Sequence, residues 1–336
     1  MLIVTDFARA LAAIARCRGN VLNAKAMAAA SYGETSKVVL LLQRAIDTGA
    51  LSLDAGQLAD YIGTAPAVSV VGAVDRISPW RRGAPGVPVL VDKVPPTASW
   101  RREGAPLVVT NASFDIVRLS GDRSVGGIIC YTAEAGRALG DVFMRQLGDD
   151  AASAVAAAEG SALFDPDNDG TGDAPESLVH AGITVASTGT SADELRADIG
   201  RVLDQFEGDA QRAVWVASAS SAARFALLGD GLGNADTTVR GGALTGFPLV
   251  AAAGVPPDVL SLVDPSGVVI FDDGLRVDTS EQTLLNTTDD EGATEVLSLW
   301  QANIGAAKFS RVADWQAARP ASVVTLTGID WTTPTP

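Results

Sequence analysis

The feature that most constrains this chain is one long helical pattern over residues 132–164. Thr132 can cap its start, and Glu134 places negative charge in the first turn, where the helix dipole favours it. A helix of this length spans about 50 Å, more than a compact domain needs for its own core. The pattern therefore predicts an extended subunit. We expect a bend at Gly148, because glycine is costly inside a helix. The apolar stripe recurs at spacings of three and four residues and comprises Leu139, Val142, Phe143, Leu147, Ala151, Ala154 and Ala158.

The composition narrows the class of protein. With 47% hydrophobic and 19% charged residues in 336, the chain can build a real core and is long enough for two domains. A net charge of −15 repels nucleic acid and anionic membranes, which argues against a DNA-reading protein. No apolar run reaches the roughly 18 residues of a membrane span. We also expect no cleaved signal peptide, and no metal at Cys17 or Cys130.

Residues 80–113 differ in character from the rest, because prolines and glycines surround two strand-like runs, 87–94 and 107–110. Proline is tolerated only at the edge of a sheet or outside it, so this hairpin should project from the body. An arm without its own core must find its partners elsewhere, and we expect a neighbouring copy. The side chains expected at that contact are Trp80, Arg81, Arg82, Lys93, Trp100, Arg101, Arg102 and Glu103.

The other segments alternate between helical and strand-like patterns. Before the long helix we expect helices within 1–48 and at 53–62, and strands at 68–74, 114–119 and 124–131. After it, a compact α/β region is expected from strands 183–186, 214–217 and 249–252 and helices 191–206 and 220–228. Long strands follow at 268–271, 275–279, 295–302 and 306–313, with a β-rich tail at 322–331.

Several motifs follow one another in a recognisable order. Ala98-Ser-Trp-Arg-Arg-Glu-Gly-Ala-Pro precedes Phe114-Asp-Ile-Val-Arg-Leu and the long helix, and Leu244-Thr-Gly-Phe-Pro-Leu-Val and Arg319-Pro-Ala-Ser-Val-Val-Thr-Leu come later. In this order they resemble the extended loop, returning strand, spine helix, axial-domain centre and closing segment of the major capsid proteins of tailed bacteriophages. That family has the Hong Kong 97-type fold, and the resemblance covers roughly residues 50 to 330.

The resemblance implies an α+β fold with four parts. The first two parts are an N-terminal helical arm at 1–66 and an extended β-hairpin loop at 80–113. The third is a peripheral domain at 67–79, 114–178 and 267–320, which holds the spine helix 132–164 and a β-sheet. The fourth is an α/β axial domain at 179–266 and 321–336.

The resemblance also implies a structural role, with no enzyme activity and no cofactor. Such subunits self-assemble into the pentamers and hexamers of an icosahedral head, first as a procapsid that matures around packaged double-stranded DNA. The implied partners are further copies, a portal, and a scaffold or decoration protein, in a virion assembled in the host cytoplasm. No sequence-specific DNA binding and no membrane contact are expected.

Two departures from the family matter. Residues 1–48 lack the long charged scaffolding segment of many relatives. In the type member of the family, a glutamate catalyses the cross-linking of subunits. The corresponding segment here, Leu299–Ala302, contains no acid. Although Lys93 lies in the loop, we therefore expect neighbouring subunits to be joined non-covalently.

An acidic loop follows the long helix. Five acids stand at positions 1, 3, 5, 9 and 12 of a calcium-loop pattern, with Gly170 at position 6. Pro166 and Pro175 restrict this loop, so a solvated turn is the alternative to a calcium site. The candidate ligands are Asp165, Asp167, Asp169, Asp173 and Glu176.

Other functions remain as alternatives. His180 is the single histidine, and Ser177 and Asp173 near it give no oriented triad. A bacterial encapsulin-type compartment shares the subunit fold and would hold cargo enzymes in place of DNA. A soluble α/β enzyme with a decorated hairpin would require a pocket of convergent titratable groups, and no motif here has catalytic spacing.

Overall fold

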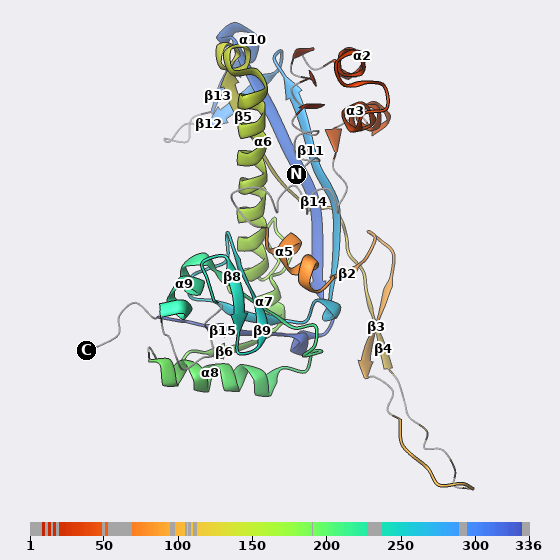
Figure 1. Ribbon diagram of the computed structural model, residues 1–336, viewed down its shortest axis with the longest axis vertical. Coiled ribbons are helices and arrows are strands. Elements are labelled where there is room, and N and C mark those ends of the chain that lie inside the picture. Colours follow the sequence, from red (N-terminus) through yellow and green to blue (C-terminus); the bar gives the residue numbers. More distant parts are fainter. Residues whose placement is uncertain are drawn as a thin grey trace. The chain divides into compact units, whose positions relative to one another are not determined.

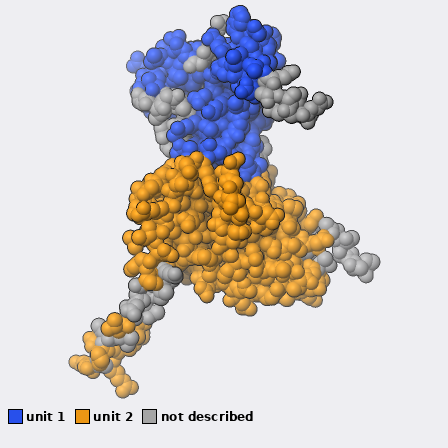
Figure 2. Space-filling view, turned by 180° about the vertical axis from the view of Figure 1, so that it is seen from behind, with its two compact units in different colours: residues 1–72, 124–159, 272–312 blue, residues 73–123, 160–271, 313–336 orange. Residues whose placement is uncertain are grey.

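The computed structural model describes residues 9–10, 13–14, 16–17, 20–48, 51–52, 69–94, 98–104, 106, 109, 113–189, 191–227, 237–288 and 294–330. The chain divides into two compact units (Figure 2). Unit 1 comprises residues 1–72, 124–159 and 272–312, and unit 2 comprises residues 73–123, 160–271 and 313–336. The predicted axial domain falls within unit 2, whereas the residues predicted for the peripheral domain are divided between the two units.

The long helix is α6, Ala133–Phe164, and it confirms the predicted spine helix (Figure 1). Its start is capped as expected, since the Ala135 N–H donates to the Thr132 hydroxyl at 3.3 Å. The prediction of a bend at Gly148 was wrong. The non-helical residue is Gly140, with φ 50° and ψ −123°, a conformation open to glycine and strained for other residues.

Unit 1 packs α6 against a sheet. The strands run in the order β1-β11-β14-β5, and β2 also pairs with β11. Leu147 and Val155 of α6 share one buried cluster with Val277 of β11 and Phe309 of β14. Helices α2 (Val21–Tyr32) and α3 (Lys37–Thr48) add to that cluster, which confirms helices within residues 1–48. The strand bounds are Leu51–Ser52 for β1, Arg81–Arg82 for β2, Ser124–Thr132 for β5, Val268–Ser280 for β11 and Ile304–Ala317 for β14.

Two predictions for this part of the chain need correction. Residues 268–271 and 275–279 form one strand, because β11 continues through Gly274, which has φ 88°. The strand expected at 295–302 ends at Ser298, whose hydroxyl accepts from the Gln301 N–H and begins the short helix α10, Leu299–Ala302. A hairpin of β12 (Leu284–Thr288) and β13 (Thr294–Ser298) precedes that helix.

A helix is found where the sequence predicted the strand 68–74. Residues Val70–Ile77 form α5, although β-branched residues favour strands. Val70, Val71 and Val74 are buried. Val74 lies four residues after Val70 and three after Val71, and residues at these spacings share a helix face, so tertiary burial overrides the local preference. The predicted helix at 53–62 and strand at 107–110 fall outside the described residues, apart from Val109, which is assigned to no strand.

The main sheet of unit 2 has six strands in the order β6-β15-β10-β7-β9-β8. Alternate sheet residues such as Trp215 and Leu262 share one buried cluster with Ile199 of helix α8 and Phe225 of helix α9. This arrangement confirms the predicted α/β region. The bounds are α7 Leu178–Ala181, β6 Ile183–Ala186, α8 Ala192–Gln205, β7 Val214–Ser218, α9 Ala219–Leu227, β8 Gly241–Leu244, β9 Phe247–Ala252, β10 Leu260–Val263 and β15 Val323–Thr327.

Candidate assembly interface

The predicted arm begins at a firmly held base in unit 2. The Trp80 N–H donates to Asp75 Oδ1 at 3.1 Å, and Arg82 Nη2 lies 3.0 Å from Asp75 Oδ2. Strand β2 then pairs in parallel with Val269 and Ile270 of β11. Trp80 is only 4% exposed, so the expectation that it anchors in a neighbouring copy was wrong: its ring is buried in its own chain.

The turn that follows the arm is held by one carboxylate. Asp314 Oδ2 accepts from the Ser120 N–H at 2.7 Å, the Ser120 hydroxyl at 3.0 Å and the Gly121 N–H at 3.1 Å. Gly121 has φ 65°, and a Cβ there would lie 2.6 Å from the Pro85 ring. These contacts fix the backbone on both sides of the hairpin base.

The arm itself contains a two-stranded hairpin, β3 (Val89–Val94) with β4 (Ser113–Val117), which confirms two of the predicted strands (Figure 1). One face of the hairpin is covered. Val91 and Val117 are buried in a small cluster with Leu119 and Val269 of the same unit.

The opposite face of the hairpin is apolar and open. Leu90 pairs directly with Ile116 across the two strands, and these side chains are 56% and 57% exposed. Phe114 lies two residues from Ile116, hence on the same face, and is 57% exposed. We call Leu90, Phe114 and Ile116 the hairpin face. Sequence reasoning missed it, although the alternation in Phe114-Asp-Ile-Val was the available signal.

Residues beyond β3 carry the remaining predicted contact side chains. Trp100 is fully exposed, and Arg101, Arg102 and Glu103 beside it are exposed as well. Arg81 already donates to the Leu90 carbonyl within its own chain. Lys93 lies in β3, and its side chain is outside the described part of the structure. Trp100 is therefore the large apolar side chain of the arm that is most open to a partner among the described residues.

A second open apolar surface lies on unit 1, at the β12–β13 hairpin. Leu284 is 65% exposed, Val296 64% and Trp300 of the adjoining helix α10 73%. Leu284 and Val296 share a hairpin face, because Leu284 pairs with Ser298 and Val296 is two residues from it. Exposed aromatic and aliphatic side chains in one region are typical of a protein contact surface.

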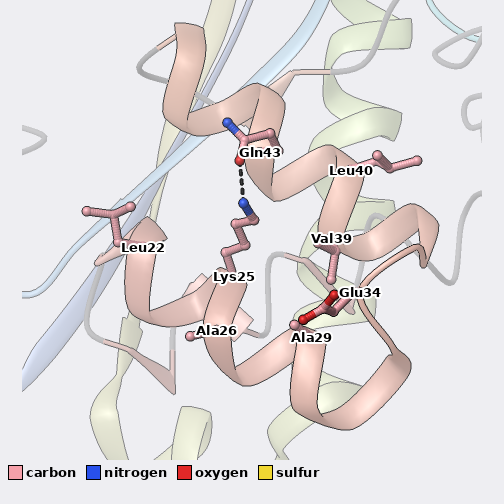
Figure 3. A pocket seen from close by; sticks show the side chains of 8 residues that line it. All are labelled: Leu22, Lys25, Ala26, Ala29, Glu34, Val39, Leu40 and Gln43. Carbon is pink, nitrogen blue, oxygen red and sulfur yellow. Dashed lines mark hydrogen bonds between the residues drawn. The ribbon is translucent and has the colours of Figure 1, made fainter.

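Helices α2 and α3 border an open groove of about 520 Å³ (Figure 3). Lys25 and Gln43 hydrogen-bond to each other across it, and Glu34 lies near Ala29 and Val39. A catalytic pocket would bring several titratable side chains together. Here the charged lining residues are Lys25 and Glu34, and Lys25 is hydrogen-bonded to Gln43.

The acidic loop does not bring its carboxylates together in this structure. Among the described residues, which include all five candidate ligands, no group of three acids, histidines or cysteines is placed to hold a metal ion. The carboxylates serve the loop itself: Asp165 Oδ1 accepts from the Asp167 N–H, and Asp169 Oδ1 accepts from Thr171. Glu176 Oε1 lies 2.8 Å from His180 Nδ1. The alternative hypothesis, a solvated turn, fits this geometry, and calcium binding by the five acids, Asp173 included, stays a prediction.

The structure contains a buried ionic cluster that the sequence analysis did not predict. In unit 1, Arg311 of β14 lies 2.9 Å from Glu159 of α6 and also pairs with Asp272 of β11. All three side chains are at most 3% exposed. Its members are up to 152 positions apart in sequence, so no local pattern could have revealed it.

Comparisons with known proteins give a consistent result. No protein-family model matches the chain. A capsid polyprotein of Pseudomonas phage PAJU2 is 28% identical over 176 residues, which cover 48% of this chain and 26% of that protein. The match therefore spans only about a quarter of the relative's length.

Solved structures match over most of the chain. One from Mycobacterium phage Cain has 17% identity and a TM-score of 0.55, covering 82% of this chain and 94% of the other. One from Mycobacterium phage Adephagia has 16% identity and a TM-score of 0.54, covering 80% and 93%. The capsid of an empty GTA particle has 15% identity and a TM-score of 0.50, covering 76% and 89%.

At such identities a structural likeness establishes the fold. The observed elements agree with it: a long helix packed on a sheet in unit 1, a six-stranded sheet with helices in unit 2, and a hairpin arm. The chain therefore has the α+β Hong Kong 97-type fold and resembles the capsid proteins of tailed bacteriophages in both sequence and structure.

Proposed function

We propose that this chain is the major capsid protein of a tailed phage or prophage. Its copies assemble into the pentamers and hexamers of an icosahedral head that encloses double-stranded DNA. The arm and the N-terminal helices join neighbours, and the protein has no enzymatic role. Other partners would be a portal and a scaffold or decoration protein, in a virion assembled in the host cytoplasm.

The observation that carries this proposal is the hairpin face. A two-stranded hairpin is at best marginally stable alone in water, and here only one of its faces is covered by its own chain. Leu90, Phe114, Ile116 and the fully exposed Trp100 form apolar surface on a single arm. Aromatic and aliphatic groups of this kind supply the central contacts of protein interfaces. A second copy of the chain is the partner that shell assembly provides.

The remaining features fit such a shell. The net charge of −15 would not hold DNA to the inner wall, which suits a container from which DNA must later leave. No described helix is long and apolar enough to cross a bilayer. Residues Leu299–Ala302 form α10 without an acid, which favours non-covalent joints between neighbours.

Electron microscopy of the purified full chain tests the proposal. Closed icosahedral shells or capsomer rings are expected, and the contents of the shells distinguish a phage head, with DNA, from an encapsulin-type compartment, with cargo enzymes. A denaturing gel should show only the monomer band. A uniform population of single subunits would refute the proposal, and a ladder of covalent oligomers would refute its non-covalent part.

A further inference from the structure

The buried ionic cluster of unit 1 joins three long elements and one loop residue. Arg311 Nη1 donates to Glu159 Oε2 at 2.9 Å, and Arg311 Nε donates to Asp272 Oδ1 at 2.9 Å. The Ser69 hydroxyl also donates to Glu159 Oε2, at 3.1 Å. Glu159 Oε1 is buried and lacks a hydrogen-bond partner among the described residues, although it lies 2.9 Å from Arg311 Nη1.

The position of these residues along the chain is informative. Helix α6 and strands β11 and β14 each extend beyond unit 1. Of the residues that belong to unit 1, Glu159 is the last in α6, Asp272 is the first in β11 and Arg311 is the last but one in β14. Ser69 lies near the end of the first segment of unit 1, which ends at residue 72. Unit 1 consists of three segments, 1–72, 124–159 and 272–312, and the cluster gathers residues that lie near four of the ends of these segments.

The charges of the cluster do not balance. Two carboxylates share one guanidinium, and no other charged group is among those that act on Glu159. Burial raises the pKa of Glu159, the nearby Asp272 raises it further, and Arg311 opposes both. Burial alone would lower the pKa of Arg311, but the two carboxylates raise it, so Arg311 stays protonated. Replacing a buried ion cluster by neutral groups often stabilises a protein, so such clusters are poor evidence of a stabilising role.

We propose that the Glu159–Arg311–Asp272 cluster is an acid-sensitive lock that sets how α6, β11 and β14 are aligned where they leave unit 1. With Glu159 ionised, Arg311 ties helix α6 to both strands. When Glu159 gains a proton, the cluster becomes neutral overall, the tie between α6 and β14 weakens, and these elements can shift relative to each other. The lock is a property of the single chain and does not depend on shell assembly.

The sign of the pH effect follows from the raised pKa of Glu159. A carboxyl group with a higher pKa in the folded state than in the unfolded state stabilises the fold when it is protonated. This contribution is complete at pH values below the pKa of the unfolded state. That contribution is lost as the pH rises through the folded value. Ionised Glu159 therefore costs stability near neutral pH, and the isosteric variant Glu159→Gln should not carry this cost.

The test compares thermal unfolding of the full-length wild type and of Glu159→Gln between pH 4 and pH 8, and amide hydrogen exchange of α6 and β14 at one fixed pH near neutrality. Ser69→Ala is the matched control, because it removes one hydrogen bond to Glu159 but no charge. We expect the Tm of Glu159→Gln to match wild type at pH 4 and to exceed it by about 2 °C or more at pH 8. We also expect faster exchange near residues 159 and 311 in this variant, but not in the control.

A Tm difference that is the same at every pH, or a Glu159→Gln variant less stable than wild type at pH 8, would overturn the proposal. Unchanged exchange in α6 and β14 would do so too. Asp272→Asn provides an independent check if Glu159→Gln does not fold. Removing this second carboxylate balances the charge around Arg311, so the Asp272→Asn variant should lose much of the pH dependence of Tm. A pH dependence of Tm in Asp272→Asn that equals that of the wild type would refute the proposed lock.

Discussion

Replacing the three residues of the hairpin face by serine should block assembly while leaving the subunit folded. Leu90, Phe114 and Ile116 point away from the buried cluster that holds the hairpin to unit 2. Their loss removes apolar surface that the isolated subunit exposes to water. Serine is a weaker strand former, but the β-propensity scale spans only about 1 kcal/mol, so the hairpin should survive.

The size of the effect follows from the exposed fractions. Each of the three side chains is 56–57% exposed, and burying a whole side chain of this kind is worth about 1.5–3 kcal/mol. Covering the exposed part in a neighbour should therefore contribute roughly 1 kcal/mol or more per residue, and about 3–4 kcal/mol per arm. This corresponds to about two to three orders of magnitude in the association constant.

Light scattering against protein concentration measures this effect as the critical concentration for assembly. We expect the triple variant to need at least a hundredfold higher concentration than wild type, with unchanged far-ultraviolet circular dichroism. Leu203→Ser is the control, because Leu203 is an exposed leucine of helix α8, away from the arm in sequence. Assembly of the triple variant at the wild-type concentration would refute the reasoning.

Three further predictions concern stability, each measured by denaturant unfolding of the full chain. Arg311→Met leaves two buried carboxylates without their cation and should cost about 3–5 kcal/mol; an unchanged midpoint would show that the cluster is not buried as described. Asp314→Ala removes three hydrogen bonds that hold Ser120 and Gly121 and should cost roughly 2–3 kcal/mol, and a loss below experimental error would contradict this anchoring role. In Gly200→Ala of α8 the added Cβ meets no atom within 4 Å, so the substitution should raise the free energy of unfolding by about 0.5–1 kcal/mol. In Gly126→Ala the added Cβ would lie 2.3 Å from the Phe309 carbonyl oxygen, so this substitution should lower the free energy of unfolding. A Gly126→Ala variant more stable than Gly200→Ala would contradict the packing described for these two sites.

The local features of the sequence predicted local structure well. The apolar stripe and the Thr132 cap located α6. The helix predicted over residues 191–206 is α8, and both hydrogen bonds of a capping box form between Ser191 and Glu194 at its start. Alternating residues located β4 and β5. In each case the pattern that stabilises the element lies within the element, so one sequence is enough to find it.

Features that depend on distant residues were missed. Trp80 was expected to be exposed because it flanks the projecting arm. It is instead buried, and its N–H donates to Asp75 of α5, a helix that the sequence did not predict. The glycines of α6 are chemically alike, so the sequence could not tell that Gly140 and not Gly148 takes a non-helical conformation. The spacing of the acidic loop matched a calcium pattern, but spacing does not fix where carboxylates point, and here they cap their own turn.

The central claim is that this subunit is completed only by other copies of itself. The most direct test is the molar mass of the purified full-length chain, measured by sedimentation velocity over a wide range of concentration. We expect capsomer-sized or shell-sized particles that become more abundant as concentration rises. A single species at the 34.4 kDa mass of one chain at every concentration would contradict the account.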